Sequence, residues 1–519
     1  MVRAIIKSGV YHDSVTLMLA TRKVNSLPGI DDASIVMATK ENLAILKNAG
    51  MLPAEMESAS GNDLIIAVKA QQEEQAKEAM QAVDRIIQEL RKKDDKEADQ
   101  PPKSLESALK MMPDANFSLI SVAGKYAVAE ARKALESNLH VMLFSDNVSP
   151  EDELALKRIA HEKGLLMMGP DCGTAIINGV PLAFANVVKR GNIGIVGASG
   201  TGIQEVSAII SNNGGGISQA IGTGGRDLRK ETGGIMFLDA LRALVSDDQT
   251  AVICLISKPP HPEVLKKLID ALKQIKKPTV TLFMGSDEKL SEGLNTLAAQ
   301  TLEEAALLAV AISNNQQTKK IREDLNHRKE QINQQAKSLA KEANGKYIRG
   351  LFSGGTLCHE VQLILARSGV KTYSNTPVDE SYKLKDINAS QEHTLIDMGE
   401  DEFTSGRPHP MIDFSLRRKR MLEEAQDKEV AVILFDVVLG YGSNLDPAGE
   451  LVSVIKKIKK ENRSLRFVCS ITGTGKDPQN LEKVKAALED AGVVVMPSMA
   501  AAADLCSSIV HLLDERGCC

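Results

Sequence analysis

The chain has 519 residues, and its 63 Lys and Arg are outnumbered by 68 Asp and Glu, which gives a formal net charge of −5 at pH 7. This balance disfavours a basic nucleic-acid footprint, and the absence of Trp argues against a base-stacking platform. The first residues are too briefly apolar for a signal peptide, and no apolar run reaches the roughly 20 residues of a membrane helix. The seven Cys include no CxxC pair and the His have no ligand spacing, so we expect no metal site. We therefore expect a cytoplasmic enzyme with no nucleic-acid or membrane partner.

The first part of the chain is predicted to be a small α/β domain over residues 1–95. Short β-rich runs at residues 2–6, 33–37 and 64–68 alternate with helical segments, the last of which covers residues 73–90. A charge run and two prolines follow, and they predict a solvated linker over residues 96–112. No chemical motif stands out in this domain.

The rest of the chain alternates buried strands with helices, in two blocks. Residues 113–313 follow this rhythm, which predicts parallel sheets with helices on both faces and ligand sites at the carboxyl ends of the strands. Residues 314–345 are polar and helical, and we expect a solvated connector there, with a partner-binding coil as the alternative. The rhythm resumes over residues 346–519 and resembles the earlier block, which indicates two related α/β domains.

Two loops at equivalent places of this repeat are candidate anion sites. Ser199-Gly200-Thr201 follows the strand at residues 193–196, and Gly354-Gly355-Thr356 follows the strand at residues 348–352. Glycine lets the backbone approach an anion closely, and a helix N-terminus offers unpaired N–H groups and a positive dipole end. A tight β–α turn is the alternative for each loop alone. No Lys follows the last Gly, which disfavours a Walker-type nucleotide site.

Carboxylates follow both loops within the first helical turns. Glu205 comes after the first loop and Glu360 after the second, and beside a bound phosphate they would orient a reacting group or accept a proton. The alternative is a surface Glu stabilised by the helix dipole.

Three further loops supply candidate substrate-binding residues. Asp171 and Cys172 follow a predicted strand at residues 165–168, although turn formation and packing account for Cys172 better than reactivity does. Arg226 ends a Gly-rich loop and would grip a carboxylate or phosphate. Arg407 and His409 lie in a loop stiffened by two prolines, suited to anion binding and proton transfer, or simply solvated.

Several segments resemble a known family. GLLMMGPDCGTAI, GNIGIVGASGTGIQE and IGTGGRDL, within residues 164–244, are similar to the α subunit of succinyl-CoA synthetase. RGLFSGGTLCHE, TLIDMGEDEF and VILFDVVLGYGSNLDP are similar to the CoA-ligase domain of its β subunit. Their fusion, together with FSDNVSPEDE, LAFAN, SKPP and GRPHPMID, resembles the FdrA family of predicted acyl-CoA synthetases over essentially the whole chain.

This resemblance implies several Rossmann- and flavodoxin-like parallel-sheet domains behind the small N-terminal α/β domain. Residues 113–187 would be a CoA-binding-like Rossmann domain, residues 188–313 a CoA-ligase-like flavodoxin-like domain, and residues 346–519 a second one. It also implies that the two Gly-Thr loops point at one phosphate, with Glu205 beside it, and that CoA is a possible cofactor.

Departures from the synthetases change the expected reaction. The segment that carries their phosphohistidine has no His here after residues 283–287, and their ATP-grasp domain is absent. The resemblance extends to subunits of the oxamate carbamoyltransferase of allantoin catabolism, which needs neither. We therefore expect acyl or carbamoyl transfer to or from phosphate, within a complex of further subunits or a homo-oligomer. The alternatives are an acyl-CoA synthetase whose ATP is handled elsewhere, with CoA near residues 169–174 and 222–227, and a non-catalytic scaffold subunit.

Overall fold

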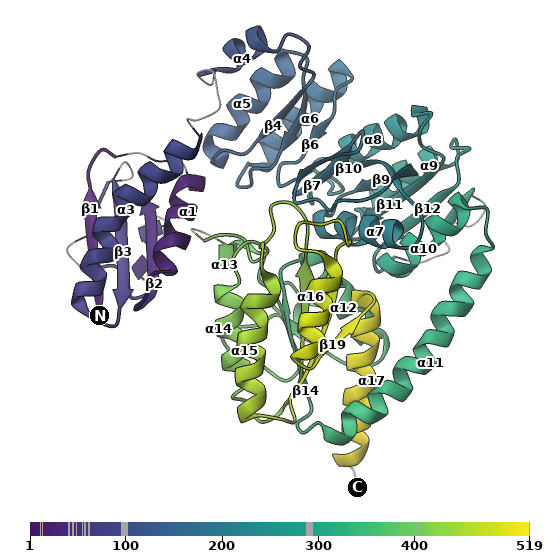
Figure 1. Cartoon of the computed structure of the whole chain (residues 1–519). Helices are drawn as coiled ribbons and strands as arrows, with labels where there is room; N and C mark the ends of the chain where they lie inside the picture. The colour runs from purple at the N-terminus through teal and green to yellow at the C-terminus, as the bar shows by residue number, and fades with distance from the viewer. Residues whose placement is uncertain are drawn as a thin grey trace. The chain divides into compact units, whose positions relative to one another are not determined.

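The computed structural model divides the chain into two compact units, Met1–Met111 with Glu400–His409 and Met112–Gly399 with Pro410–Cys519 (Figure 1). It describes residues 1–94, with gaps at 11, 13, 40–41, 44–45, 48, 54–55, 57–58 and 61–62, and residues 102–286, 294–404 and 407–517. Most of the expected linker before residue 102 therefore lies outside the described residues. No helix in these ranges is long and apolar enough to span a bilayer.

The first unit contains a three-stranded antiparallel sheet in the order β1-β3-β2. The central strand β3 (Leu64–Ala70) is buried at six of its seven positions because helices cover one face and residues after β2, including Ala38, Leu46 and Met51, pack on the other. The apolar side chains of β3 pack with those of the helices, including Ala20, Val24, Val83 and Ile87. The other elements are β1 (Val2–Lys7), β2 (Ile30–Met37), α1 (Ser14–Asn25) and α3 (Glu73–Asp94).

The second unit begins with a small parallel sheet in the order β4-β5-β6. Ser149 caps α6 through a hydrogen bond to the Asp152 N–H, Pro150 follows at the first turn, and Gly164 ends the helix with a positive φ of 68°. These sequence signals explain why α6 begins and ends where it does. The elements are β4 (Phe117–Ile120), α5 (Gly124–Glu136), β5 (His140–Leu143), α6 (Pro150–Lys163) and β6 (Met167–Met168), preceded by α4 (Leu105–Met111) of the first unit.

A seven-stranded sheet follows, in the order β13-β12-β11-β9-β10-β7-β8. Its first five strands in this order pair in parallel, and the antiparallel β7–β8 hairpin forms one edge. The strands are β7 (Thr174–Ile177), β8 (Val180–Ala183), β9 (Arg190–Gly197), β10 (Ile217–Gly222), β11 (Val252–Ser257), β12 (Thr279–Phe283) and β13 (Thr296–Ala298). The helices are α7 (Gly200–Asn212), α8 (Ile235–Ser246), α9 (Pro262–Leu272) and α10 (Leu302–Ser313).

A six-stranded parallel sheet completes the unit, in the order β15-β16-β14-β17-β18-β19. Its strands are β14 (Tyr347–Phe352), β15 (Tyr373–Ser374), β16 (Thr394–Asp397), β17 (Val430–Val438), β18 (Arg466–Thr472) and β19 (Val493–Met496). Its helices are α12 (Gly355–Arg367), α14 (Ser415–Glu424), α15 (Pro447–Glu461), α16 (Leu481–Asp490) and α17 (Met499–Gly517), and α13 (Asp401–Thr404) belongs to the first unit. The expected α/β class with several parallel sheets is confirmed, and we call the two large sheets with their helices the first and second repeat.

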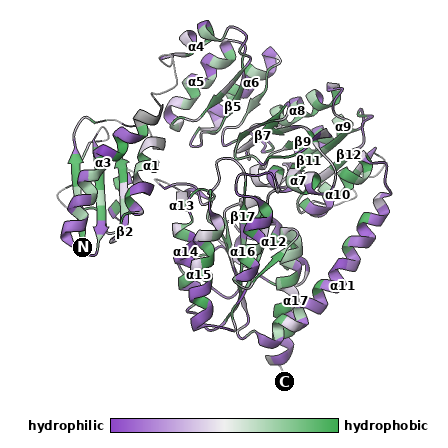
Figure 2. Cartoon of the chain, viewed as in Figure 1, coloured by the Kyte–Doolittle hydropathy of each residue, from purple (hydrophilic) through white to green (hydrophobic). Residues whose placement is uncertain are grey.

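The connector α11 (Thr318–Glu342) is a helix, as expected, but it is not solvated on all sides. Figure 2 shows its length as mostly hydrophilic, yet Ile332, Ala336 and Ala340 are buried. Their i, i+4 spacing forms one stripe, and small alanines let α17 approach closely. The Arg516 Nη1 donates to the Ala340 carbonyl at 2.5 Å, and the Ser508 hydroxyl donates to the Asn333 side-chain oxygen at 2.7 Å. The expected polar connecting helix is present, and its low mean hydropathy conceals a narrow apolar stripe.

We predict that Ile332→Ala lowers the free energy of unfolding of the second unit by about 2–4 kcal/mol, because a buried side chain is truncated to a cavity. Lys337→Ala, at an exposed position of the same helix, should change it by less than about 0.5 kcal/mol. Urea unfolding followed by far-UV circular dichroism measures both. Equal midpoints for the two variants would show that α11 does not pack on α17.

Candidate functional site

The two Gly-Thr loops meet inside the second unit. β9 leads into the N-terminus of α7 and β14 into that of α12, and the Ser199 Oγ lies 2.5 Å from the Thr356 Oγ1. A Cβ on Gly354 would come within 2.7 Å of the Thr201 Cγ2, so the loops touch through glycine. The six predicted phosphate-binding residues therefore share one location, which we call the loop junction: Ser199, Gly200, Thr201, Gly354, Gly355 and Thr356.

The two helix ends at the junction differ in their electrostatics. The α7 end is capped by its own Ser199, whose Oγ accepts from the Gly202 N–H at 3.0 Å. The α12 end has Gly354 as its cap residue and no side-chain cap, and carboxylates lie beside it instead. The Asp436 carboxylate accepts from the N–H groups of Ser353 and Gly354, each at 2.9 Å. Because Asp436 already occupies these N–H groups, the α12 end has fewer donors left for an added anion than the α7 end.

Two of the carboxylates at the junction were missed by sequence reasoning. Asp436 is buried near the end of β17 and bonds the fully buried Arg417, whose Nη2 lies 3.0 Å from the Asp436 Oδ1. Burial lowers the pKa of Arg417. Asp397 ends β16, and its Oδ2 lies 2.2 Å from the position that a Cβ on Gly355 would take. A single Asp within a long apolar run was a usable signal for Asp436, whereas Asp397 needs the strand order to bring it to Gly355.

Glu205 and Glu360 are interior groups that cap helices of the opposite repeat. Glu205 on α7 accepts from the Thr472 hydroxyl and, at 3.4 Å, from the Met499 N–H at the start of α17. Glu360 on α12 accepts from the Leu302 N–H at the start of α10, at 2.7 Å. Both carboxyls are at most 3% exposed, so the alternative of a surface Glu is wrong.

Burial sets the protonation of these two carboxyls. It raises the pKa of Glu205 to about 7 and the pKa of Glu360 to about 8, and the nearby charge of Glu303 raises both. A carboxyl that titrates near neutral pH is suited to holding or moving a proton. Glu205 therefore remains a candidate for proton transfer at the junction.

The other candidates of this unit are occupied by contacts within the protein. The Cys172 thiol is 2% exposed and lies 3.4 Å from the Gly222 carbonyl, and burial raises its pKa to about 12, so it is no nucleophile. Arg226 bonds the Glu153 carboxylate at 2.9 Å and the Val148 carbonyl at 2.8 Å, which leaves little of its guanidinium for a substrate. Asp171 is exposed.

The two loops near which CoA was expected, residues 169–174 and 222–227, leave no concave space between them. A Cβ on Gly224 would meet the Pro170 carbonyl at 2.4 Å, and one on Gly222 the Thr174 carbonyl at 2.4 Å, so the loops pack directly on each other. Behind them Lys157 is fully buried and bonds Asp227 at 2.7 Å. The space between the loops is therefore filled by the protein itself, their exposed positions are Asp171 and Gly225 at the outer rim, and CoA binding in this region stays a prediction.

Arg407 and His409 belong to the first unit, next to α13. The Arg407 N–H donates to the Thr404 carbonyl at 3.0 Å, and the preceding Gly406 lies outside the described residues. Their roles in anion binding and proton transfer stay predictions. Over the described ranges, no group of three His, Cys, Asp or Glu residues is arranged to hold a metal ion.

We predict a pH-dependent effect of Glu205→Gln, which imitates the protonated side chain. The folded pKa of about 7 exceeds the usual 4.5, so this carboxyl's contribution to stability is complete below pH 4.5 and is lost as the pH rises to about 7. The variant should match the wild type at pH 4.5 and exceed it by about 1–3 kcal/mol above pH 8. Urea unfolding across this pH range measures the difference.

Glu162→Gln, at an exposed position, is the matched control and should follow the wild type at every pH. A constant difference between Glu205→Gln and the wild type from pH 4.5 to 8 would contradict the raised pKa.

Comparison with known proteins agrees with this architecture. Residues 188–285 match a family model described as CoA binding domain, and residues 351–509 match one described as CoA-ligase. The CoA-binding match falls in the part that the sequence analysis assigned to the first CoA-ligase-like domain. Residues 1–103 match a model described as AllF, heavy metal-associated domain.

Individual relatives cover different shares of the chain. YahF of Escherichia coli (strain K12) is 45% identical over 501 residues, 96% of each protein. Subunit alpha 1 of the ADP-forming succinate–CoA ligase of Archaeoglobus fulgidus is 26% identical over 176 residues, 33% of this chain and 59% of that protein. The solved structure of PH0766 from Pyrococcus horikoshii OT3 has a TM-score of 0.32 at 17% identity, over 78% of this chain and 86% of that one.

The two CoA-type matches lie in the repeats that form the loop junction, and they make the chain acyl-CoA ligase-like. The identity to YahF extends over nearly the full length of both proteins. The chain belongs to the FdrA family of succinyl-CoA synthetase-like proteins.

Proposed function

We propose that this protein is an enzyme subunit that transfers an acyl or carbamoyl group to or from phosphate at the loop junction. Its most concrete form is an oxamate carbamoyltransferase-type subunit, which interconverts carbamoyl phosphate and oxamate with oxalurate and phosphate. The observation that carries the proposal is the direct meeting of the α7 and α12 N-termini, with Ser199 and Thr356 in contact. No His lies between His261 and His327, so the segment after β12 supplies no phosphohistidine.

The junction offers the electrostatics that such a transfer needs. The N–H groups at the start of α7, together with the hydroxyls of Ser199 and Thr201, would stabilise the phosphate charge without reorganisation. In the transfer the amide nitrogen of oxamate attacks the carbamoyl carbon, the carbon–oxygen bond to phosphate breaks, and phosphate leaves. The proton released from nitrogen would pass to a carboxylate, for which Glu205 is suited by its pKa near 7.

The substrate carboxylate needs a separate cation. Of the two arginines that the sequence singled out, Arg226 is held by Glu153 and the Val148 carbonyl, and Arg407 belongs to the first unit, so a role of either in holding the substrate carboxylate stays a prediction. Replacing whichever arginine holds that carboxylate would raise the KM for oxamate more than it lowers kcat, because a binding contact is lost in ground and transition state alike.

The second candidate function is acyl-CoA ligation with ATP handled by another subunit. The matches to the CoA-binding and CoA-ligase models favour it. Calorimetric titration of the purified chain separates the candidates: binding of carbamoyl phosphate or phosphate without CoA supports transfer to phosphate, and tight CoA binding supports ligation. Binding of none of them would contradict both for the chain alone.

We predict that Gly355→Ala weakens carbamoyl phosphate binding by at least about tenfold and lowers the transfer rate by about 100-fold, because the new Cβ displaces Asp397 and shifts the junction. Gly475→Ala is the matched control, since Gly475 is exposed and a Cβ there has open space. Calorimetry and the rate of phosphate release measure both variants. Unchanged binding and rate in Gly355→Ala would remove the junction as the site.

A further inference from the structure

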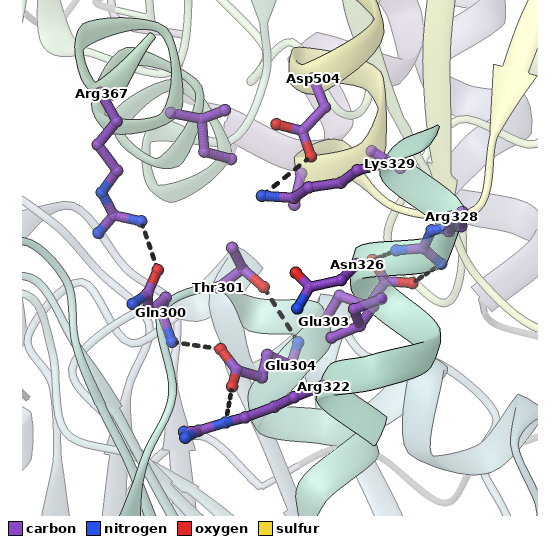
Figure 3. Close-up of a pocket in the computed structure, with 14 residues that line it drawn as sticks. Gln300, Thr301, Glu303, Glu304, Arg322, Asn326, Arg328, Lys329, Arg367 and Asp504 are labelled. Atoms are coloured by element: carbon purple, nitrogen blue, oxygen red, sulfur yellow. Dashed lines mark hydrogen bonds and ion pairs between the residues drawn. The ribbon is translucent and has the colours of Figure 1, made fainter. Parts of the chain in front are cut away.

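A pocket of about 300 Å³ lies apart from the loop residues of the junction, where α11 crosses both repeats (Figure 3). Its walls come from the N-termini of α10 and α17, the side of α11 and the C-terminal end of α12. It therefore exists only because the connector packs against the two repeats together. Its volume suits a small metabolite.

The charge of the pocket lining favours an anion. Four basic side chains and three carboxylates line it, and the positive ends of the α10 and α17 dipoles each add about half a charge. The sum is roughly two positive charges, which matches a dianion. The charged residues are Arg322, Arg328, Lys329 and Arg367, and Glu303, Glu304 and Asp504.

Two of the four cations are already used by the protein. The Arg322 Nε bonds the Glu304 carboxylate at 2.7 Å, and Arg328 bonds both oxygens of Glu303. These pairs hold α11 on the start of α10 and leave little capacity for a ligand.

The other two cations are held more loosely. Arg367 forms no ion pair with any residue that the structure describes, and its Nη1 makes only a 3.4 Å contact with the Gln300 side-chain oxygen. The Lys329 Nζ forms a long ion pair with Asp504, at 3.8 Å. Figure 3 shows Arg367 and Lys329 entering the pocket from different helices. An anion between them would gain charge-assisted bonds from both sides.

We infer that this pocket binds a small dianion that carries phosphate or carboxylate groups, at a site separate from the loop junction and independent of the proposed transfer. Glu303 lies between the pocket and the helix ends behind the junction, since it bonds Arg328 on one side and accepts from the Ser498 hydroxyl at 2.6 Å on the other. Ser498 directly precedes the α17 end that Glu205 caps.

Titration calorimetry of the full chain at constant ionic strength tests the inference with inorganic phosphate and, separately, succinate. Arg367→Gln, at an exposed helical position, should weaken binding of the recognised anion by at least about tenfold and leave the unfolding temperature unchanged. Lys320→Gln, exposed on α11 outside the pocket, is the matched control and should bind as the wild type does.

Phosphate binding at the junction is distinguished with Gly355→Ala. The pocket's binding persists in that variant and is lost in Arg367→Gln, whereas junction binding shows the reverse. Tighter binding of phosphate would show that the pocket recognises a phosphate group, and tighter binding of succinate that it recognises carboxylate groups. The inference is overturned if neither anion binds, if Arg367→Gln binds as the wild type does, or if Lys320→Gln is weakened equally.

Discussion

The crossed capping of helices by Glu205 and Glu360 is the constraint on which the second unit depends. Glu205 of the first repeat accepts from an N–H at the start of α17, the last helix of the second repeat. Glu360 of the second repeat accepts from an N–H at the start of α10, the last helix of the first repeat. Buried N–H groups at a helix start cost free energy when they have no hydrogen-bond acceptor. Each repeat therefore supplies a carboxyl acceptor to a helix start of the other. The same two bonds fix α7 against α12, because both carboxyls lie only one turn beyond the Gly-Thr loops. The geometry of the junction thus follows from the way the repeats are locked.

This locking explains why buried acids are tolerated at the centre of the unit. A buried carboxylate without a cation is expensive, and the raised pKa values of Glu205 and Glu360 show that part of this cost is avoided by protonation. Glu303 differs, since Arg328 of the connector neutralises it. The connector therefore contributes a charge to the interior as well as a covalent link, which gives a reason for its apolar stripe and its ion pairs with both repeats.

The sequence allowed the prediction of features that depend on local pattern, and not of those that depend on strand order. Alternation of apolar strands and helices predicted parallel sheets, and glycine before Thr201 and Thr356 predicted two helix starts of the same kind. Nothing local shows that Arg226 meets Glu153, that Cys172 is enclosed, or that Asp397 reaches Gly355, because each partner lies on another element. The apolar stripe of α11 could be predicted from the i, i+4 spacing of its apolar residues, although the mean hydropathy of the helix does not reveal it.

The junction is symmetric in backbone and asymmetric in charge, and this difference bears on its chemistry. Both helix starts present N–H groups, yet Asp436 takes those of Ser353 and Gly354 and is itself held by Arg417. The Asp436 carboxylate therefore already lies at the start of α12, whereas the start of α7 is capped by the neutral hydroxyl of Ser199. In the proposed transfer the anion would then bind at the α7 start, and Glu205 of the same helix would take up the proton. An anion bound equally by both helices would need Asp436 or Asp397 to be protonated or displaced, so the phosphate of the proposed transfer would be held mainly by α7.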